Sequence, residues 1–284
     1  MNIDIICPLY NAERYIRKLH ESLLMQENVF VSNIKYILTK SNDRTAEILN
    51  DMNVDYEEIL PNEFSHSLTR EKAAFKSNAD IIVFITQDIV IKDKLWLYYL
   101  TKGIIDGECE EAYSRQIAKD NGIEKYTREI NYPKESRLFT KDDVEKIGIK
   151  AFFSSDASSA IRRDVFVKLN GYDGKLIPTS EDMYITYKLI MNGYRVKYCA
   201  DSIIYHSHDY GIRENYKKYY DIGKFFKQNN YLNKYKVIKA GGGMAKYILK
   251  SAIKDKNIKV LFKFIPNMTS RFIGLQMGRR DGEF

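Results

Sequence analysis

Three short apolar runs, rich in β-branched residues, alternate with stretches of helical character in the first third of the chain. The runs cover residues 3–7, 34–38 and 81–86. Runs of this length with few charges indicate buried strands. Helical connections between them are typical of parallel pairing, because parallel strands need a long crossover. The sequence therefore predicts an α/β fold with a mostly parallel central sheet flanked by helices.

The first crossover is the easiest to interpret. We expect Pro8 to end the first strand and Asn11 to cap a helix over residues 12–25. Ile16, Leu19 and Leu23 recur in this segment at helical spacing. A buried strand is thus predicted to lead directly into a helix N-terminus.

The rest of the chain is less regular. Residues 108–150 show no clean period, and we expect loops on the acceptor side there. The remaining predicted elements are helices over 163–169 and 181–191, a turn at 170–174, strands over 195–198 and 202–206, and helices over 211–229 and 244–278, the last broken by glycines at 241–243 and by Pro266.

The composition limits the class of protein. Hydrophobic residues make up 44% of the 284 residues, which is enough for a sizeable core. The three cysteines form no CxxC pair, and their odd number suits a reducing compartment. The chain starts without a basic, apolar leader and has no long apolar run. We therefore expect a cytoplasmic protein.

The net charge of +7 is concentrated at the C-terminal end. From Ala240 onward the chain has nine Lys or Arg and three acidic residues. Ile258, Phe262 and Ile265 share one helical face there, and lysines lie on another. This amphipathic basic helix either packs on the rest of the protein or contacts an anionic membrane; the sequence leaves both open.

Polar residues follow each predicted strand of the first half. Ligands of open α/β sheets bind beyond the carboxyl ends of the strands. Asp88 follows the most apolar strand and could hold a divalent cation beside phosphates, or could simply cap a turn. Gln87 beside it either binds a sugar or phosphate or faces solvent. The acidic Asp43 is interpreted as a turn or cap residue.

Two further groups of residues carry possible chemistry. Glu181 and Asp182 open a predicted helix, where acids either relieve its unpaired N–H groups or serve as a general base for a sugar hydroxyl. His206 could join Asp88 in a metal site or be structural. Arg70 lies on a helix that we expect Ser67 to cap, where it either pairs with phosphate or is solvated.

Taken in order, several motifs resemble glycosyltransferase family 2 and its bacterial rhamnosyltransferase-like branch over essentially the whole chain. They are CPLYNAE, SNDRT, FSHSLTR, FITQD, FSSDASSAIRR, SEDM, YCADSIIYHSHDY and KKYYDIGKFF. The resemblance implies a GT-A (Rossmann-like) fold, a nucleotide-diphospho-sugar donor, a divalent metal (Mg or Mn) and an inverting displacement.

The resemblance also implies roles for single residues. Asp182 would be the catalytic base with Glu181 supporting it, and Asp88 and His206 would hold the metal. The donor would be bound by the residues of four segments: Pro8, Tyr10, Asn11, Ser41, His66, Arg70, Thr86, Gln87 and Asp88. Two departures stand out, because Leu38-Thr39 replaces a base-reading carboxylate and Thr86 replaces the first Asp of Asp-x-Asp.

These inferences give one expected function. The chain would transfer a sugar, L-rhamnose from dTDP-L-rhamnose, to a lipid-linked saccharide acceptor in bacterial surface polysaccharide synthesis. We expect a catalytic domain over 1–210, with a nucleotide-sugar half at 1–100 and an acceptor half at 101–210. A helical extension over 211–284 would attach to the inner face of the plasma membrane. No nucleic-acid partner is expected, and a homodimer stays open.

Two rival interpretations remain. The first keeps the family and changes the donor to a UDP-hexose or UDP-N-acetylhexosamine, because motifs do not distinguish sugars. The second is a non-catalytic basic protein that binds membranes or nucleic acid through its C-terminal helices.

Overall fold

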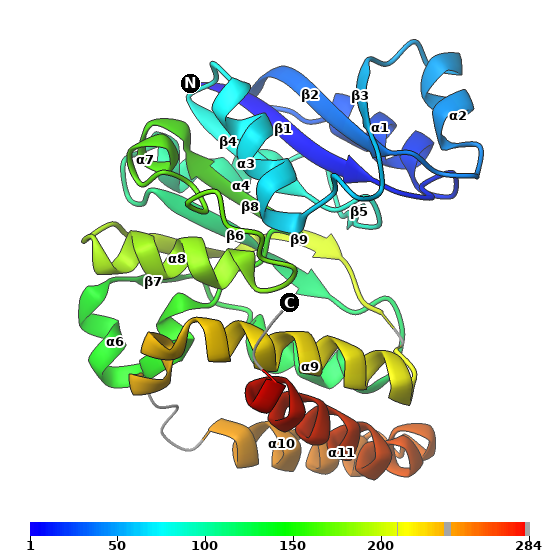
Figure 1. Cartoon of the computed structure of the whole chain (residues 1–284), viewed down its shortest axis with the longest axis vertical. Coiled ribbons are helices and arrows are strands. Elements are labelled where there is room, and N and C mark those ends of the chain that lie inside the picture. Colours follow the sequence, from blue (N-terminus) through cyan, green and yellow to red (C-terminus); the bar gives the residue numbers. More distant parts are fainter. Residues whose placement is uncertain (209, 236–239, 282–284) are drawn as a thin grey trace. The chain divides into compact units, whose positions relative to one another are not determined.

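The computed structural model describes residues 1–208, 210–235 and 240–281 (Figure 1). The chain forms two compact units. The first unit contains Met1–Arg115, Lys134–Lys141 and Phe152–His206, and the second contains Gln116–Pro133, Asp142–Ala151 and Ser207–Phe284. The second unit therefore combines the helical C-terminal segment with two segments from the middle of the chain.

A nine-stranded mixed sheet, ordered β3-β2-β1-β4-β8-β6-β9-β5 with β7 beside β9, organises the first unit. The strands are β1 (Asn2–Leu9), β2 (Phe30–Thr39), β3 (Tyr56–Ile59), β4 (Ile81–Ile85), β5 (Val90–Ile91), β6 (Glu111–Ile117), β7 (Arg137–Phe139), β8 (Ser158–Arg162) and β9 (Val196–Tyr205). The first four strands are parallel, whereas β8 runs antiparallel to both β4 and β6. The α/β prediction is confirmed, with an antiparallel half added to the parallel one.

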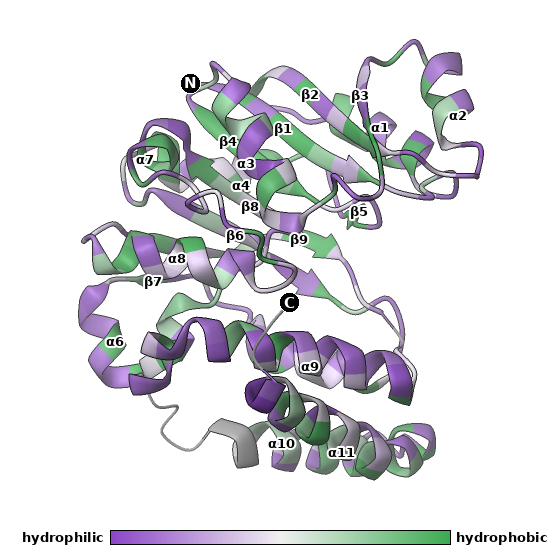
Figure 2. Cartoon of the chain, viewed as in Figure 1, coloured by the Kyte–Doolittle hydropathy of each residue, from purple (hydrophilic) through white to green (hydrophobic). Residues whose placement is uncertain are grey.

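Helices cover both faces of the sheet because side chains alternate along each strand. The helices are α1 (Ile16–Leu24), α2 (Thr45–Asp51), α3 (His66–Lys76), α4 (Trp96–Ile105), α7 (Arg163–Lys168) and α8 (Glu181–Met191). Val83 of β4 belongs to the core shared with α1, α2 and α4. Its neighbour Phe84 points the other way and meets Phe166 of α7. Figure 2 shows the hydrophobic stretches along β1 and β4 that make this possible.

The first crossover differs in detail from the prediction. Pro8 lies inside β1, opposite Ile37, and the strand continues to Leu9. The helix α1 begins at Ile16 after Tyr15. Asn11 does not cap it but adopts a positive φ of 49° in the connecting turn, a conformation that asparagine tolerates better than most residues.

Other predicted elements are mostly confirmed, with three exceptions. The turn at 170–174 and the helices α7 and α8 lie where expected. The two short strands predicted over 195–206 form one strand, β9. The segment 108–150 is not mainly loops, since it holds β6, β7, α5 (Ile123–Asn131), α6 (Lys141–Ile147) and a 3-10 turn. The glycines at 241–243 and Pro266 lie inside helices and break neither.

The second unit contains α5, most of α6 and of the 3-10 turn after it, α9 (Ile212–Gln228), a second short 3-10 turn, α10 (Ala240–Lys254) and α11 (Ile258–Asp281). Ile123, Tyr126, Ile248, Ala252 and Val260 form its small core. Among the described residues, no helix is both long enough and apolar enough to span a bilayer. Asp209, which lies in the HSHDY motif, falls outside the described residues.

Glycines set the contact between α9 and α11. A Cβ on Gly278 would lie 1.9 Å from the carbonyl oxygen of Tyr220, and one on Gly274 would lie 2.4 Å from that of Tyr216. Gly223 of α9 meets the backbone of Leu275 in the same way. Small residues four apart let two helix backbones approach closely. The two helices run in the same direction, because Tyr216 and Tyr220 meet Gly274 and Gly278 in that order.

We predict that Gly278→Ala forces α9 and α11 apart and lowers the free energy of unfolding by about 1–3 kcal/mol, as overpacking does. Gly243→Ala in α10 is the matched control, because nothing lies within 4 Å of its Cβ position. That control should leave stability unchanged or raise it by up to about 1 kcal/mol through helix propensity. Denaturant titration of both variants measures the difference, and equal stabilities would contradict the close-contact account.

Candidate functional site

Several chain segments meet at one edge of the sheet. The parallel strands β1 and β4 both end there. β8 begins there, because it is antiparallel to β4 and pairs Ser158 with Ile85. The amide of Thr86 donates to the carbonyl of Ala157 across 3.3 Å. Residues far apart in sequence therefore surround the same carboxyl edge, as the sequence pattern predicted.

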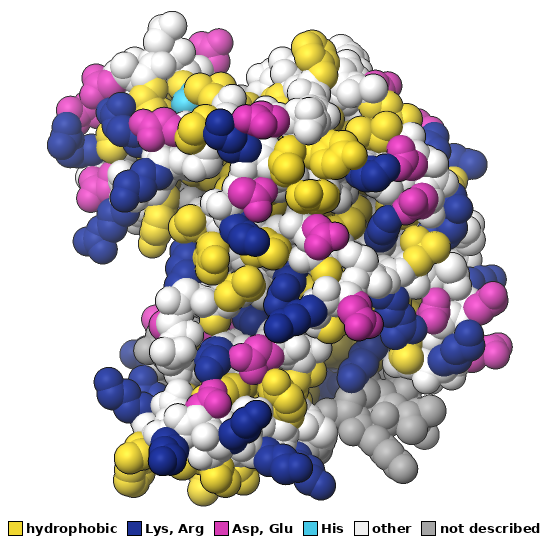
Figure 3. All heavy atoms as spheres, turned by 180° about the vertical axis from the view of Figure 1, so that it is seen from behind, with side chains coloured by type: hydrophobic (Ala, Val, Ile, Leu, Met, Phe, Trp, Pro, Cys, Tyr) yellow, Lys and Arg dark blue, Asp and Glu magenta, His cyan; other side chains and the backbone are white. Residues whose placement is uncertain are grey.

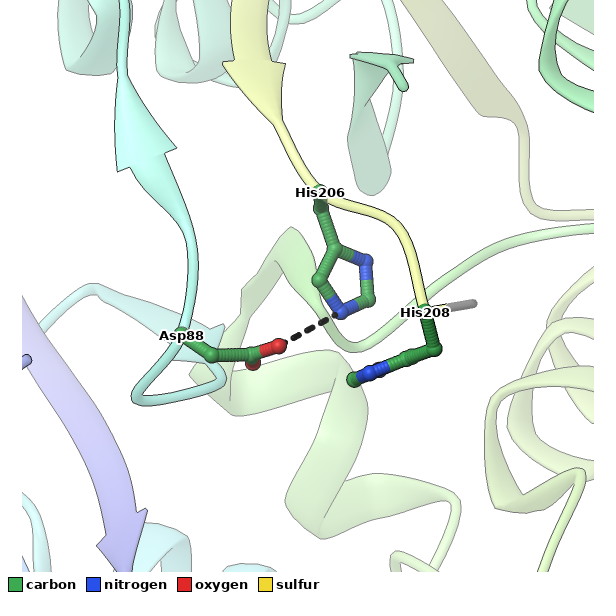
Figure 4. Close-up of side chains that lie close together, drawn as sticks. All are labelled: Asp88, His206 and His208. Carbon is green, nitrogen blue, oxygen red and sulfur yellow. Dashed lines mark ion pairs between the residues drawn. The ribbon is translucent and has the colours of Figure 1, made fainter. Parts of the chain in front are cut away.

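Asp88 and His206 lie together at this edge (Figure 4). Oδ2 of Asp88 is 3.4 Å from Nε2 of His206, and His206 is buried, with 7% of its surface exposed. β9 brings the histidine there by pairing Tyr205 with Val90 of β5, two residues after Asp88. A carboxylate and an imidazole are ligand types that Mn²⁺ accepts. The hydroxyl of Thr86 is buried without a hydrogen-bond partner, so a further polar ligand would satisfy it.

Gln87 has a structural role at the same edge. Its Oε1 accepts a hydrogen bond from the backbone amide of Tyr10 at 2.7 Å, and its Nε2 donates to the carbonyl of Tyr10 at 2.8 Å. The side chain of Gln87 therefore fixes the segment after β1 against the segment after β4. The ring of Tyr10 itself remains 54% exposed.

Asp43 fixes the neighbouring loop, as the sequence predicted. Its carboxylate accepts hydrogen bonds from the amides of Glu13 and Thr45 and from the hydroxyls of Ser41 and Thr45. Burial alone would raise the pKa of Asp43, but these bonds outweigh it and lower the pKa. The hydroxyl of Thr45 in turn accepts the amide of Ala12. The segments after β1 and β2 are thereby joined.

Arg70 is buried rather than displayed at the surface of its helix. Only 2% of it is exposed, and its Nη1 lies 3.4 Å from Oε1 of Glu181, the first residue of α8. The same Oε1 is 3.8 Å from Nδ1 of His66. Ser65, and not Ser67, caps α3 by accepting the amide of Leu68. Ser67 faces inward, where it donates to the carbonyl of Lys175.

A cluster of carboxylates surrounds this arginine. Burial raises the pKa of Asp156 and of Glu181, and the charge of Arg70 only partly opposes the two shifts. Burial also raises the pKa of Asp182, and the neighbouring charges of Glu181 and Asp156 raise it further. Among the described residues, no positive charge belongs to the main causes that shift the pKa of Asp182, and its Oδ1 accepts the amide of Met183 at 2.7 Å. Asp182 is thus the carboxyl of the adjacent pair that no arginine neutralises.

Sequence reasoning missed two members of this cluster. Asp156 lies just before β8, inside the FSSDASSAIRR motif, and accepts the hydroxyls of Ser159 and Tyr172. Glu111 begins β6 and accepts the hydroxyls of Ser154 and Thr186. An acid inside the FSSDASSAIRR motif, directly before an apolar strand, was a usable signal for Asp156. The acidic surroundings of Glu111 looked like a solvated turn.

The metal-type pair and the carboxylate cluster belong to the same edge. Cys7 of β1 is fully buried, which raises the pKa of its thiol; Arg70 opposes that shift and Asp88 adds to it. The charges of Arg70 and Asp88 therefore both act on Cys7. With Thr86 bonded to Ala157, which follows Asp156, the structure brings Asp88, His206, Glu181 and Asp182 to one end of the sheet.

Comparisons with known proteins identify the family of the chain. Residues 4–169 match the family model described as glycosyl transferase family 2. The chain is 34% identical to the O-antigen chain rhamnosyltransferase RfbN of Salmonella typhimurium (strain LT2), over 79% of this chain and 72% of that protein. It is 30% identical to the O-antigen chain rhamnosyltransferase WbaN of Salmonella anatum, over 98% and 89%.

A solved structure gives the fold. A mannosyltransferase from Pyrobaculum calidifontis, PcManGT, determined with GDP-Man and Mn²⁺, superposes with a TM-score of 0.66 at 13% identity. The match covers 99% of this chain and 86% of that one. The mixed sheet with flanking helices is therefore the GT-A fold.

The buried Glu111 gives a pH-dependent prediction. Burial raises its pKa from 4.5 to about 8, so folding favours the protonated form. The contribution of Glu111 to stability is complete below about pH 4.5 and is lost as the pH rises through about 8. We predict that wild type loses unfolding free energy relative to Glu111→Gln between pH 5 and 8. Parallel denaturation curves measure this; a pH-independent difference would contradict it.

Proposed function

Because the chain belongs to glycosyltransferase family 2, we propose that it transfers L-rhamnose from dTDP-L-rhamnose to a lipid-linked saccharide during synthesis of a bacterial surface polysaccharide. The 30% identity to the rhamnosyltransferase WbaN over 98% of the chain is the observation that carries this choice of sugar. A nucleotide-sugar donor itself follows from the family. The carboxyl edge of the sheet provides the residues for the transfer.

Asp182 is proposed as the general base. A sugar hydroxyl is a poor nucleophile, and a carboxylate within hydrogen-bond reach can take its proton while the new bond forms. Glu181 is already paired with Arg70 at 3.4 Å, which leaves Asp182 for the acceptor. The raised pKa of Asp182 brings its basicity closer to that required near neutral pH. Glu181 and Arg70 would position the start of α8.

Asp88 and His206 fit a divalent cation, Mn²⁺ or Mg²⁺. Their atoms are 3.4 Å apart at a buried edge, beside the orphaned hydroxyl of Thr86. Such an ion, when bound, supplies positive charge that stabilises a departing diphosphate. His208 follows His206 by two residues, a distance of at most about 7 Å along an extended chain, and we include its imidazole as a further ligand.

The donor's nucleotide is proposed to lie along the segments after β1 and β2. Pro8, Tyr10 and Asn11 belong to the first, and Ser41 to the second. Thr39 ends β2 with a buried hydroxyl that has no hydrogen-bond partner. That hydroxyl lies at the end of the second strand, where the resemblance implies that relatives carry a base-reading carboxylate. It suits a hydrogen bond to a base carbonyl, and His66 at the start of α3 lines the sugar side.

We predict that Asp182→Asn lowers kcat by about 10²–10⁴-fold, because removing a general base costs that much, while metal-dependent dTDP binding is retained. Glu181→Gln serves as the comparison and should cost less. In wild type, kcat/KM should rise with pH through the raised pKa of Asp182, since only the carboxylate form accepts a proton. Rate profiles with dTDP-rhamnose measure both. An unchanged kcat in Asp182→Asn would reject the assignment.

The donor is tested by a screen. We predict acceptor-dependent release of dTDP from dTDP-L-rhamnose, and no UDP release from UDP-glucose or UDP-N-acetylglucosamine under the same conditions. Addition of EDTA should abolish the release, and added Mn²⁺ or Mg²⁺ should restore it. If UDP release were the main activity, the donor would be a UDP-sugar instead of dTDP-L-rhamnose. Full activity in EDTA would contradict the need for a metal.

The C-terminal helices are proposed to attach the enzyme to the inner membrane face, where a lipid-linked acceptor resides. Ile258, Phe262, Ile265 and Phe272 recur along one face of α11 and are 64%, 81%, 71% and 63% exposed. We call them the apolar stripe. Hydrophobic and basic side chains lie next to each other at the bottom of Figure 3, where α10 and α11 are drawn. An exposed apolar stripe with flanking lysines suits an anionic bilayer.

We predict that Phe262→Ser combined with Ile265→Ser weakens binding to phosphatidylglycerol vesicles by at least about 100-fold, because burying each side chain is worth about 1.5–3 kcal/mol. Leu24→Ser combined with Phe30→Ser is the control, since these side chains of the first unit are 66% and 65% exposed. Vesicle co-sedimentation compares them. Equal losses in both pairs would contradict attachment through the apolar stripe.

A further inference from the structure

A cavity of about 350 Å³ lies within the second unit, and His208 is among its lining residues. Its wall combines residues before and at the start of α5, the start of α9, and one side of α11. The volume lies in the range of small-ligand pockets. Three basic side chains line it, Lys259, Lys263 and Arg271, together with two acidic ones, Asp120 and Glu124.

Both acids have partners in this unit, and Glu124 pairs with Arg271, one of the three bases of the cavity. Glu124 is shared by two arginines, with Oε1 at 3.1 Å from Nη2 of Arg271 and Oε2 at 3.6 Å from Nε of Arg128. Asp120 accepts the amide of Gly122 at 2.7 Å and the hydroxyl of Ser207 at 3.3 Å. No carboxylate of the described residues pairs with Lys259. Among the described residues, the wall therefore has one more base than acid, and Lys259 is the base without a carboxylate partner.

Buried donors point to an anion as the occupant. Arg271 is only 7% exposed, and its Nε has no hydrogen-bond partner, although its Nη1 bonds the hydroxyl of Tyr219. The N-terminus of α5 also lines the cavity, and no side chain caps it. Unpaired amides at a helix N-terminus attract phosphate groups. The Oδ1 of Asn267 is buried without a partner as well, which suits a sugar hydroxyl beside that phosphate.

The neighbouring residues indicate what is attached to the anion. Lys259 and Lys263, at the cavity, directly follow Ile258 and Phe262 of the apolar stripe along α11. A ligand with phosphate in this cavity would thus have its apolar part beside the exposed stripe. A lipid diphosphate that carries a sugar has this order of apolar, anionic and hydroxylated parts.

We propose that this cavity binds the diphosphate that joins the acceptor saccharide to its lipid. This inference rests on the proposed function for the identity of the acceptor. Phosphate binding by the cavity can be tested without any transfer reaction. Lys259, Lys263 and the N-terminus of α5 hold the phosphates, and Arg271 lies deepest.

The test uses the full chain and farnesyl diphosphate, a soluble lipid diphosphate, as the probe. Calorimetry is done in EDTA, so that Asp88 and His206 hold no cation for a diphosphate. We expect binding to wild type and to Asp88→Ala, and at least about tenfold weaker binding to Lys259→Gln combined with Lys263→Gln, because two charge-assisted contacts are lost. Lys250→Gln combined with Lys254→Gln removes the same charge from α10 and should bind as wild type.

The vesicle assay separates the sources of phosphate. Both lysine pairs should weaken binding to phosphatidylglycerol vesicles similarly, because each contributes surface charge, whereas only the cavity pair should affect farnesyl diphosphate. Equal effects of the two pairs on farnesyl diphosphate, or no binding by wild type, would overturn the proposal. If wild type did not bind dTDP in a metal-dependent way, the proposed function would be overturned. Binding of farnesyl diphosphate by the cavity would still stand.

Discussion

One buried arginine holds the carboxyl edge of the sheet together. Arg70 comes from α3, pairs with Glu181 at the start of α8, and acts on Asp156 before β8 and on Cys7 of β1. Several carboxyl groups in this small volume would otherwise repel one another or take up protons. Breaking a buried pair of this kind costs about 3–5 kcal/mol, because the remaining charge stays buried. The position of α8, and with it Asp182, depends on this contact.

The same edge is stiffened by bonds that involve no catalytic group. Gln87 binds both polar backbone atoms of Tyr10, and Asp43 binds the loop after β1 through Glu13. These bonds fix the segments after β1 and β2 relative to the segment after β4, which contains Asp88. A transferase needs its reacting groups held within a fraction of an ångström, since most of its rate depends on positioning. The neutral or structural residues of the motifs therefore serve the chemistry indirectly.

Local sequence patterns predicted the elements well and their ends less well. The apolar runs gave β1, β2 and β4, and the acidic start gave α8 at its observed first residue, Glu181. The strand end predicted at Pro8 was wrong, because a proline can lie within a strand at a position where its missing N–H is not needed for pairing. The break expected at Pro266 did not occur, since α11 continues through it.

The proximity of some site residues was predictable from the resemblance, whereas contacts that depend on burial were not. Asp88 and His206 were expected together and lie 3.4 Å apart. The pairing of Arg70 with Glu181 joins residues 111 positions apart, so no local period could reveal it. Glu111 was missed for the same reason, because its partners Ser154 and Thr186 come from distant segments. Domain boundaries also depend on such long-range contacts. Residues 116–133 belong to the second unit, whereas the boundary expected at 210 assigns them to the catalytic domain.

The helix α11 explains why the C-terminal segment combines features that usually exclude one another. One face carries Gly274 and Gly278, which must stay small for α9 to approach. The same face, nearer the start of the helix, supplies Lys259, Lys263 and Arg271 to the cavity, and a different face bears the exposed apolar stripe. If α11 served only to pack against other helices, its apolar stripe would be buried. If it served only to bind a membrane, it would not need glycines at the contact with α9. Fixing α11 to α9 through glycines sets the angle at which the stripe and the cavity are presented, so the same contact that stabilises the second unit would orient a lipid-linked acceptor.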